Sequence, residues 1–113
     1  MDDQDLRPVM NRTKWDELRL AMCALGGPPY RTMATNGHYA PIDREWVHHF
    51  RCPGAKGGWY GYCRHVDIFA SEVAGVEEIR AALAAIHVPG ARIENGWRVY
   101  GWTGPGQDVD WIA

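Results

Sequence analysis

The sequence predicts an α+β domain, in which an antiparallel sheet of about five strands carries two helices on one face. Two segments have the period of an amphipathic helix, and aromatic and β-branched runs lie between and after them. These runs are grouped into hairpins, which is typical of an antiparallel sheet. We therefore predict the order α-β-β-β-α-β-β in a single domain over residues 11–113, preceded by a flexible acidic segment at residues 1–10.

The first predicted helix starts near residue 11, where Asn11 or Thr13 can cap its N-terminus. Four apolar residues then recur at helical spacing and share one face. They are Trp15, Leu18, Met22 and Leu25. The run Gly-Gly-Pro-Pro at residues 26–29 ends the helix, because glycine and proline terminate helical segments.

Residues 30–70 have the composition of about three strands. A short run at residues 30–35 leads into Asn36-Gly37, a strong two-residue hairpin signal. Two aromatic runs, residues 45–52 and 59–70, flank the turn sequence Pro-Gly-Ala-Lys-Gly-Gly. This pattern predicts a second hairpin.

A second helix is predicted over residues 73–87, with Ser71 as its cap and Val88-Pro89-Gly90 as its end. Its apolar face consists of Val76, Ile79, Leu83 and Ile86. The remaining segment, residues 93–113, predicts two strands joined across residues 103–107.

Composition excludes some classes of protein. The formal charge of −2 and the pI of 6.2 argue against nucleic-acid binding, which requires a basic surface. The N-terminus is acidic where a secretory signal needs a basic segment, and no apolar run reaches the roughly 20 residues that span a bilayer. Three cysteines, an odd number, favour a reducing compartment. We expect a cytoplasmic protein without nucleic-acid or membrane partners and without a cofactor.

The stretch from residue 48 to residue 65 is the most suggestive of chemistry. His49, Cys52, Cys63 and His65 are two nitrogen and two sulfur ligands, a set that zinc accepts. The single residue between Cys63 and His65 is short for a zinc site, however. The other interpretation, which we favour, is an amphipathic hairpin whose solvent-facing side carries Cys63, His65 and Asp67. Cys63 lacks the local signature of a cysteine nucleophile, so we predict no catalytic residue.

Aromatic residues are unusually frequent, with six tryptophans and five tyrosines in 113 residues. Two helices cannot cover all of them, so we expect Trp59, Tyr100 and Trp102 on the uncovered face, where aromatic rings serve protein binding. Four acids could add ion pairs to such an interface. They are Asp43, Glu45, Asp108 and Asp110. The alternatives are large rings that fill the core and acids that are solvated surface residues.

Residues 9–22 carry the motif Asn-x-Thr-Lys-Trp-x-Glu-Leu, from Asn11 to Leu18. With this motif the sequence resembles a bacterial family of short, functionally uncharacterised proteins, and the similarity continues through residues 84–102 and 109–112. Such small bacterial proteins are often similar to immunity proteins, which bind and neutralise a cognate toxin. The resemblance therefore implies a protein-binding role.

These observations together predict a non-enzymatic protein-binding module, in the form of an immunity or antitoxin-like protein that occludes the active site of a toxin. The alternative is a small zinc-binding domain that uses the cysteine and histidine pairs of the stretch at residues 48–65.

Overall fold

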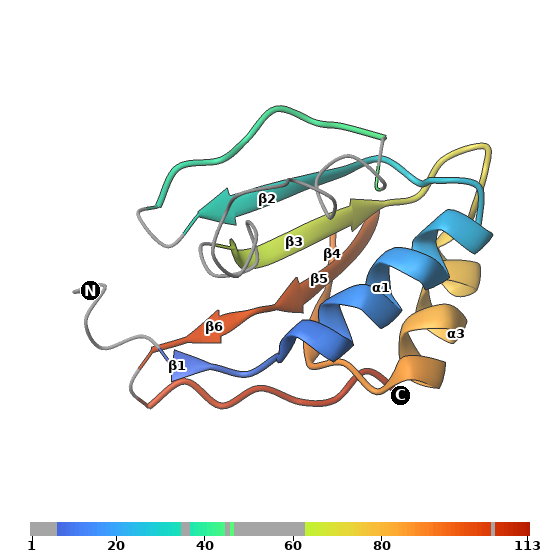
Figure 1. Ribbon diagram of the computed structural model, residues 1–113. Helices are drawn as coiled ribbons and strands as arrows, with labels where there is room; N and C mark the ends of the chain where they lie inside the picture. The colour runs from blue at the N-terminus through green and yellow to red at the C-terminus, as the bar shows by residue number, and fades with distance from the viewer. Residues whose placement is uncertain (1–6, 35–36, 45, 47–62, 105) are drawn as a thin grey trace.

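The computed structural model describes residues 7–34, 37–44, 46, 63–104 and 106–113, and it confirms the α+β class. The elements are β1 (Arg7–Pro8), α1 (Arg12–Ala24), β2 (Tyr30–Ala34), β3 (Cys63–Phe69), α3 (Val76–Ile86), β4 (Gly90–Ile93), β5 (Gly96–Tyr100) and β6 (Trp102–Thr103). The main sheet is antiparallel with the order β2-β3-β5-β4, and a second sheet pairs β1 with β6. Helices α1 and α3 pack against each other beside the main sheet (Figure 1).

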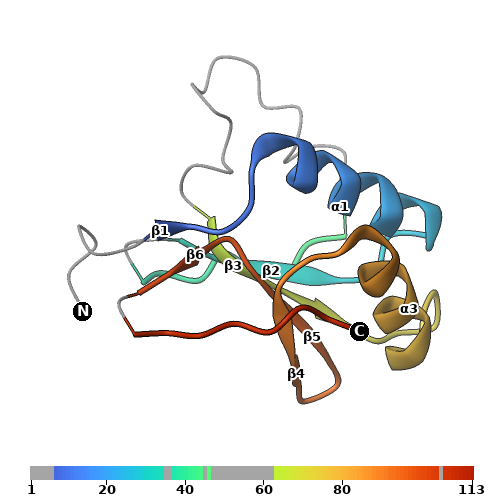
Figure 2. The same ribbon diagram turned by 90° about the horizontal axis from the view of Figure 1, so that it is seen from below.

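Strand β3 lies in the middle of the main sheet, between β2 and β5. Consecutive strand residues point to opposite faces, so β3 contributes to both. Val66 and Ile68 of β3 and Val99 of β5 are fully buried in one core cluster with the apolar residues of both helices. We call the side of the sheet that they face the helix-covered face (Figure 2). We call the other side the open face; it carries Arg31, His65, Asp67, Arg98 and Tyr100.

The first helix forms as the sequence predicts. Its cap is Asn11, whose side-chain oxygen accepts a hydrogen bond from the Lys14 backbone N–H at 2.9 Å. The first three residues of the predicted stripe are buried, and Leu25 packs half-buried against them. Gly26 and Gly27 then follow with φ values of 96° and 77°, a left-handed conformation that glycine adopts readily.

Helix α3 buries Ile79 and Leu83 as predicted, but its cap is Gly75 and the prediction of Ser71 was wrong. A turn over residues 71–74, closed by a backbone hydrogen bond, separates Ser71 from the helix. The Gly75 N–H donates to the Glu78 side chain at 3.1 Å, which is one half of a capping box.

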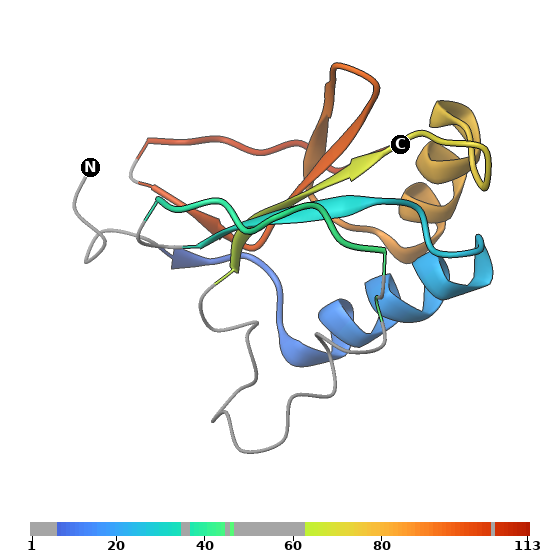
Figure 3. The ribbon, with the colours of Figure 1, turned by 90° about the horizontal axis from the view of Figure 1, so that it is seen from above.

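The hairpin after β2 is confirmed in its described part. The Ala34 N–H donates to the His38 carbonyl, and Gly37 has a φ of 90°. Residues 37–44 then return along β2, with a bridge between Met33 and Tyr39 (Figure 3). Almost all of the strand predicted over residues 45–52 lies outside the described residues, and Trp46 has helical backbone. The strand predicted over residues 59–70 corresponds to β3 in its described part.

The C-terminal third differs from the prediction, because its hairpin lies earlier. Strands β4 and β5 are joined at Glu94 and Asn95, and Asn95 has a φ of 58°. At Gly96 a Cβ atom would lie 1.9 Å from the Ile68 carbonyl oxygen, so only glycine fits beside β3. Gly96 pairs with Ile93, so the two turn residues are Glu94 and Asn95, and asparagine tolerates the left-handed conformation that this turn needs.

The hairpin predicted across residues 103–107 is also wrong, because the strand before it pairs with a strand from the N-terminus of the chain. Strand β6 pairs with β1, and the segment after residue 107 joins the sheet only through the bridge between Trp111 and Pro89 within the described residues. Within the segment 1–10 that the sequence predicts to be flexible, β1 pairs with β6 and Met10 is 7% exposed.

Candidate functional site

The open face carries a compact group of charges that we call the arginine–aspartate cluster: Arg31, Asp67 and Arg98. Strand register creates it, because Asp67 of β3 lies directly opposite Arg31 of β2 and Arg98 of β5. Residues in register on neighbouring strands lie on the same face and within contact distance. Three strands therefore bring together three charges that are far apart in the sequence.

Asp67 is held by both arginines. Arg98 Nε donates to Oδ1 at 2.8 Å and Arg98 Nη2 to Oδ2 at 3.2 Å, a fork-shaped contact. Arg31 Nε donates to Oδ2 at 3.4 Å. The Asp67 side chain is 0% exposed, whereas the arginine side chains remain 37% and 28% exposed. Hydrogen bonding to Asp67 raises the pKa of Arg98 above its ordinary value, so the guanidinium keeps its charge.

Tyr39 and His65 extend the cluster along the open face. The Tyr39 hydroxyl lies 3.3 Å from His65 Nε2 and 3.4 Å from Arg98 Nη2. The Arg31 guanidinium stacks over the Tyr39 ring, with Cζ 4.1 Å from its centroid, in a cation–π contact. Tyr39 therefore contacts both arginines: its ring stacks on Arg31, and its hydroxyl lies beside Arg98.

His65 is a weak base in this setting. Burial and, next, the positive charge of Arg98 lower its pKa from 6.5 to about 4, although Asp67, 3.9 Å away, opposes both. At neutral pH His65 is therefore uncharged. The cluster then has two positive charges and one negative charge.

An open pocket of about 400 Å³ lies beside the cluster. Besides the three cluster residues, its lining consists of Phe69, Ile93, Glu94 and Asn95. The pocket thus combines guanidinium donors and an amide with two apolar side chains. Such a mixture of apolar walls and a few placed polar groups is common in ligand sites.

The solvent-facing side predicted for β3 is wrong: Cys63, His65 and Asp67 are all buried. Cys63 belongs to the core cluster, whereas Tyr39 and the arginine side chains of the neighbouring strands enclose His65 and Asp67. The Cys63 Sγ lies 3.4 Å from the His65 carbonyl oxygen, and burial raises the pKa of this thiol well above its usual range.

The proposed zinc ligands are only half visible, since His49 and Cys52 lie outside the described residues. Burial raises the pKa of the Cys63 thiol, and His65 Nε2 lies 3.3 Å from the Tyr39 hydroxyl. Among the residues that the structure describes, no three His, Cys, Asp or Glu side chains gather as a metal site would require.

The predicted partner-binding residues that the structure describes do not form one surface. Tyr100 lies half-buried on the open face and Trp102 is half-buried in β6, while Trp59 and Glu45 are outside the described residues. Asp43 lies along β2, where its backbone pairs with Tyr30. Asp108 and Asp110 are exposed on the C-terminal segment, on the far side of the molecule from residues 37–44 (Figure 1).

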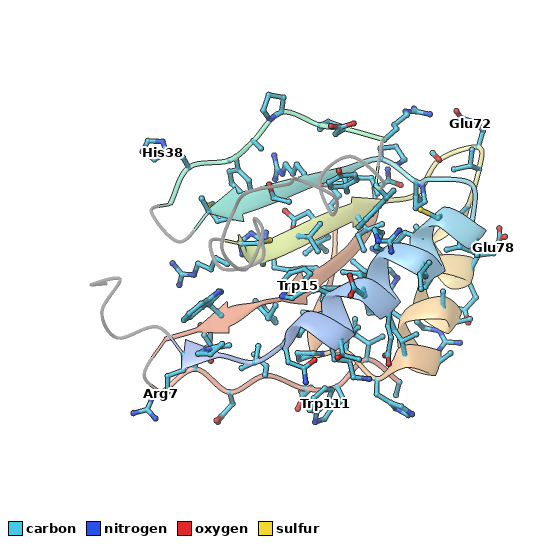
Figure 4. The ribbon with its side chains drawn as sticks, viewed as in Figure 1. Arg7, Trp15, His38, Glu72, Glu78 and Trp111 are labelled. Carbon is cyan, nitrogen blue, oxygen red and sulfur yellow. The ribbon has the colours of Figure 1, made fainter. Side chains whose placement is uncertain are left out.

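Among the described residues, the exposed aromatic rings are not the predicted Tyr100 and Trp102, which are half-buried. Trp111 is 62% exposed and Tyr39 is 43% exposed. Figure 4 shows Trp111 on the periphery and Trp15 between α1 and the sheet. The sequence does carry a signal for the missed cluster. Arg31, Asp67 and Arg98 each stand inside a short apolar run, where charges of opposite sign are expected to pair.

Comparison with known proteins identifies the family. Residues 1–106 match a group described as "Family of unknown function (DUF6678)". The chain belongs to DUF6678. No curated protein and no solved structure matches the chain. The resemblance to a family of uncharacterised proteins is thus confirmed, and the likeness to immunity proteins stays a prediction. In the described part of this DUF6678 chain, no helix has the length and apolarity to cross a membrane.

The motif that carries the resemblance is structural in this DUF6678 chain. Asn11 caps α1, and Trp15 and Leu18 are buried in the core. The Lys14 ammonium donates to the Ile86 carbonyl at the end of α3 and lies 3.1 Å from Glu17. The motif therefore ties the two helices together.

Proposed function

We propose that this DUF6678 chain is a non-enzymatic protein-binding module that recognises its partner with the open face of the sheet. The observation that carries the proposal is Asp67, a fully buried carboxylate that holds Arg31 and Arg98 on a face without a described helix. Buried ion pairs add little net stability, because desolvation offsets much of the attraction. A cluster that contributes little to stability but fixes two guanidinium groups at the surface suits recognition.

The composition of the open face supports the same role. Arginine and tyrosine are enriched among the residues that dominate binding energy at protein interfaces. Here Arg31 and Arg98 are held by ion pairs, and Tyr39 is held by stacking and by its hydroxyl contacts. Side chains that are already ordered lose less entropy when a partner docks.

The groups best suited to catalysis support a binding role over an enzymatic one. Nucleophilic catalysis by cysteine needs a thiolate beside a competent base. Burial raises the pKa of the Cys63 thiol, and His65, with a pKa of about 4, is a weak base.

The specific form that we propose is an immunity or antitoxin-like protein that occludes the active site of a cognate toxin. Its support is the resemblance of this short chain to small bacterial immunity proteins. Exposed acids outside the open face, Asp108 and Asp110, can add electrostatic steering toward basic groups of the partner.

The test is co-expression with the product of the adjacent gene, followed by size-exclusion chromatography with light scattering and by a growth assay. We expect a stable complex and rescue of growth. Both should be lost in Arg31→Glu and kept in Arg44→Glu, because Arg44 is exposed in a surface ion pair with Glu72. A wild-type chain that neither forms the complex nor restores growth would overturn the proposal.

A further inference from the structure

We infer that the pocket beside the arginine–aspartate cluster binds a carboxylate group that a protein partner presents, from an Asp or Glu side chain of an acidic segment. This inference rests on the proposed function and names the chemistry of the partner at that site. It reverses the sign of the interface predicted from the sequence, in which acids of this chain meet basic groups of the partner.

The first reason is a surplus of positive charge at the cluster. Both oxygens of Asp67 already accept hydrogen bonds from Arg98, and Oδ2 accepts a third from Arg31. Asp67 borders the pocket with a side chain that is 0% exposed, so a ligand meets the arginine side chains first. Two guanidinium groups thus share one carboxylate, and the neutral His65 adds no charge.

The second reason is the geometry of the donors. Arg31 reaches Asp67 through Nε, so the carboxylate leaves its two Nη groups available to a ligand. The cation–π contact with Tyr39 holds this guanidinium in place, and Arg31 and Arg98 both line the pocket. A planar fork of N–H donors matches the two oxygens of a carboxylate.

The third reason is the pocket wall, which favours a carboxylate on a hydrocarbon stem. Phe69 and Ile93 offer apolar contact for methylene groups, and Asn95 offers an amide at the rim. Glu94 also lines the pocket and repels anions. A phosphate, with a charge near −2, doubles this repulsion and the attraction to the arginines alike, so charge alone does not separate the two anions. The apolar wall favours a carboxylate on a hydrocarbon stem over a bare phosphate.

The inference can be tested on the full chain by NMR titration with the peptide acetyl-Gly-Glu-Gly-amide. We expect saturable shifts of the Nε–H signals of Arg31 and Arg98 and of the Asn95 amide signals. The matched glutamine peptide should bind at least tenfold more weakly. Equal binding of the two peptides, or tighter binding of inorganic phosphate than of the glutamate peptide, would contradict a carboxylate site.

Two variants separate the site from a general charge effect. Arg31→Gln should weaken the glutamate peptide at least tenfold, whereas Arg44→Gln, with the same change of net charge, should not. Glu94→Gln should tighten binding severalfold, because it removes the repelling charge from an exposed position that the fold does not need. If Arg31→Gln fails to fold, unchanged or weaker binding by Glu94→Gln still overturns the inference.

The same variants distinguish this inference from the proposed function. If the protein partner binds wild type and Arg31→Gln equally well and the peptide does not bind, the carboxylate site is wrong and the binding module stands. If the peptide binds at the pocket and no protein partner binds the wild-type chain, the site stands and the protein-binding role fails.

Discussion

Val66 and Asp67 are consecutive residues of β3, both are 0% exposed, and they are buried by different means. Val66 packs into a core that two amphipathic helices close, whereas Asp67 is enclosed by two arginine side chains from neighbouring strands. Burial by helices removes apolar surface from water and stabilises the fold. Burial by arginines encloses a charge, and its net contribution to stability is small. The helix-covered face therefore stabilises the fold, and the open face is the surface that we propose for recognition.

The largest expected effect lies on the helix-covered face. Leu83→Ala should lower the free energy of unfolding by about 3 kcal/mol, because it leaves a cavity among fully buried residues. Urea unfolding measures this change. The matched control is Leu20→Ala on α1, where the side chain is 58% exposed and the change should stay within about 0.5 kcal/mol. A similar loss in both variants would contradict the assignment of the faces.

The open face should respond less. Asp67→Asn keeps the shape of the side chain but leaves two guanidinium groups without a counter-charge, and we expect a loss of about 2 kcal/mol. The loss stays below that of a fully buried pair, because both arginines are partly exposed and water can rehydrate them. Urea unfolding of wild type and variant gives the difference.

A triple variant sharpens the same comparison. Replacing Arg31 and Arg98 by Met and Asp67 by Leu removes all three charges and should recover most of that stability, because apolar groups of similar size can replace a buried ion pair. The triple variant should not bind the partner. A triple variant that is less stable than Asp67→Asn would show that the cluster holds the fold together.

The sequence predicts the helix-covered face well and the open face poorly, for a physical reason. The positions of Trp15, Leu18, Ile79 and Leu83 follow from helical period alone, because burial under a helix requires an apolar stripe. The burial of Asp67 depends on side chains that come from two other strands, and only the strand register brings them there. Alternation along one strand therefore predicted a solvated face where the structure has an enclosed charge.

The missed β4–β5 hairpin shows the same limit. Asn95-Gly96 is a local signal that the sequence contains, and the run of aromatic residues after it drew the predicted turn to residues 103–107 instead. Without that hairpin Arg98 has no assigned neighbour, so the cluster could not be assembled from the sequence. Sheet order and register, which local patterns do not determine, are needed to place a cross-strand site.

A smaller effect should appear as a pH dependence from His65. Its pKa is 6.5 in the unfolded chain and about 4 in the folded protein, so between these values the unfolded chain binds the additional proton. The free energy of unfolding should therefore fall as pH drops from 6.5 toward 4.5, by about 1.5 kcal/mol after solvent screening. Urea unfolding at several pH values measures the slope.

Two variants give the controls for this pH dependence. His65→Gln should flatten the slope, because glutamine does not titrate. Leu83→Ala should lower the whole curve without a change of slope, since its effect is on packing and not on protons. An equal slope in wild type and His65→Gln would assign the dependence to other groups and leave His65 without a role in it.

The smallest expected effect is that of zinc removal on stability. It tests whether zinc binds at the open face. Cys63 is buried as a thiol and His65 faces Tyr39, so zinc binding would have to break both contacts before it formed its own. We expect the purified chain to hold no stoichiometric zinc, and we expect EDTA to leave its thermal unfolding temperature unchanged. Metal analysis combined with calorimetry measures both quantities. Stoichiometric zinc that is lost in His49→Ala and in Cys52→Ser would contradict this expectation and would make the cysteine and histidine pairs, rather than the arginine–aspartate cluster, the organising feature of this side of the molecule.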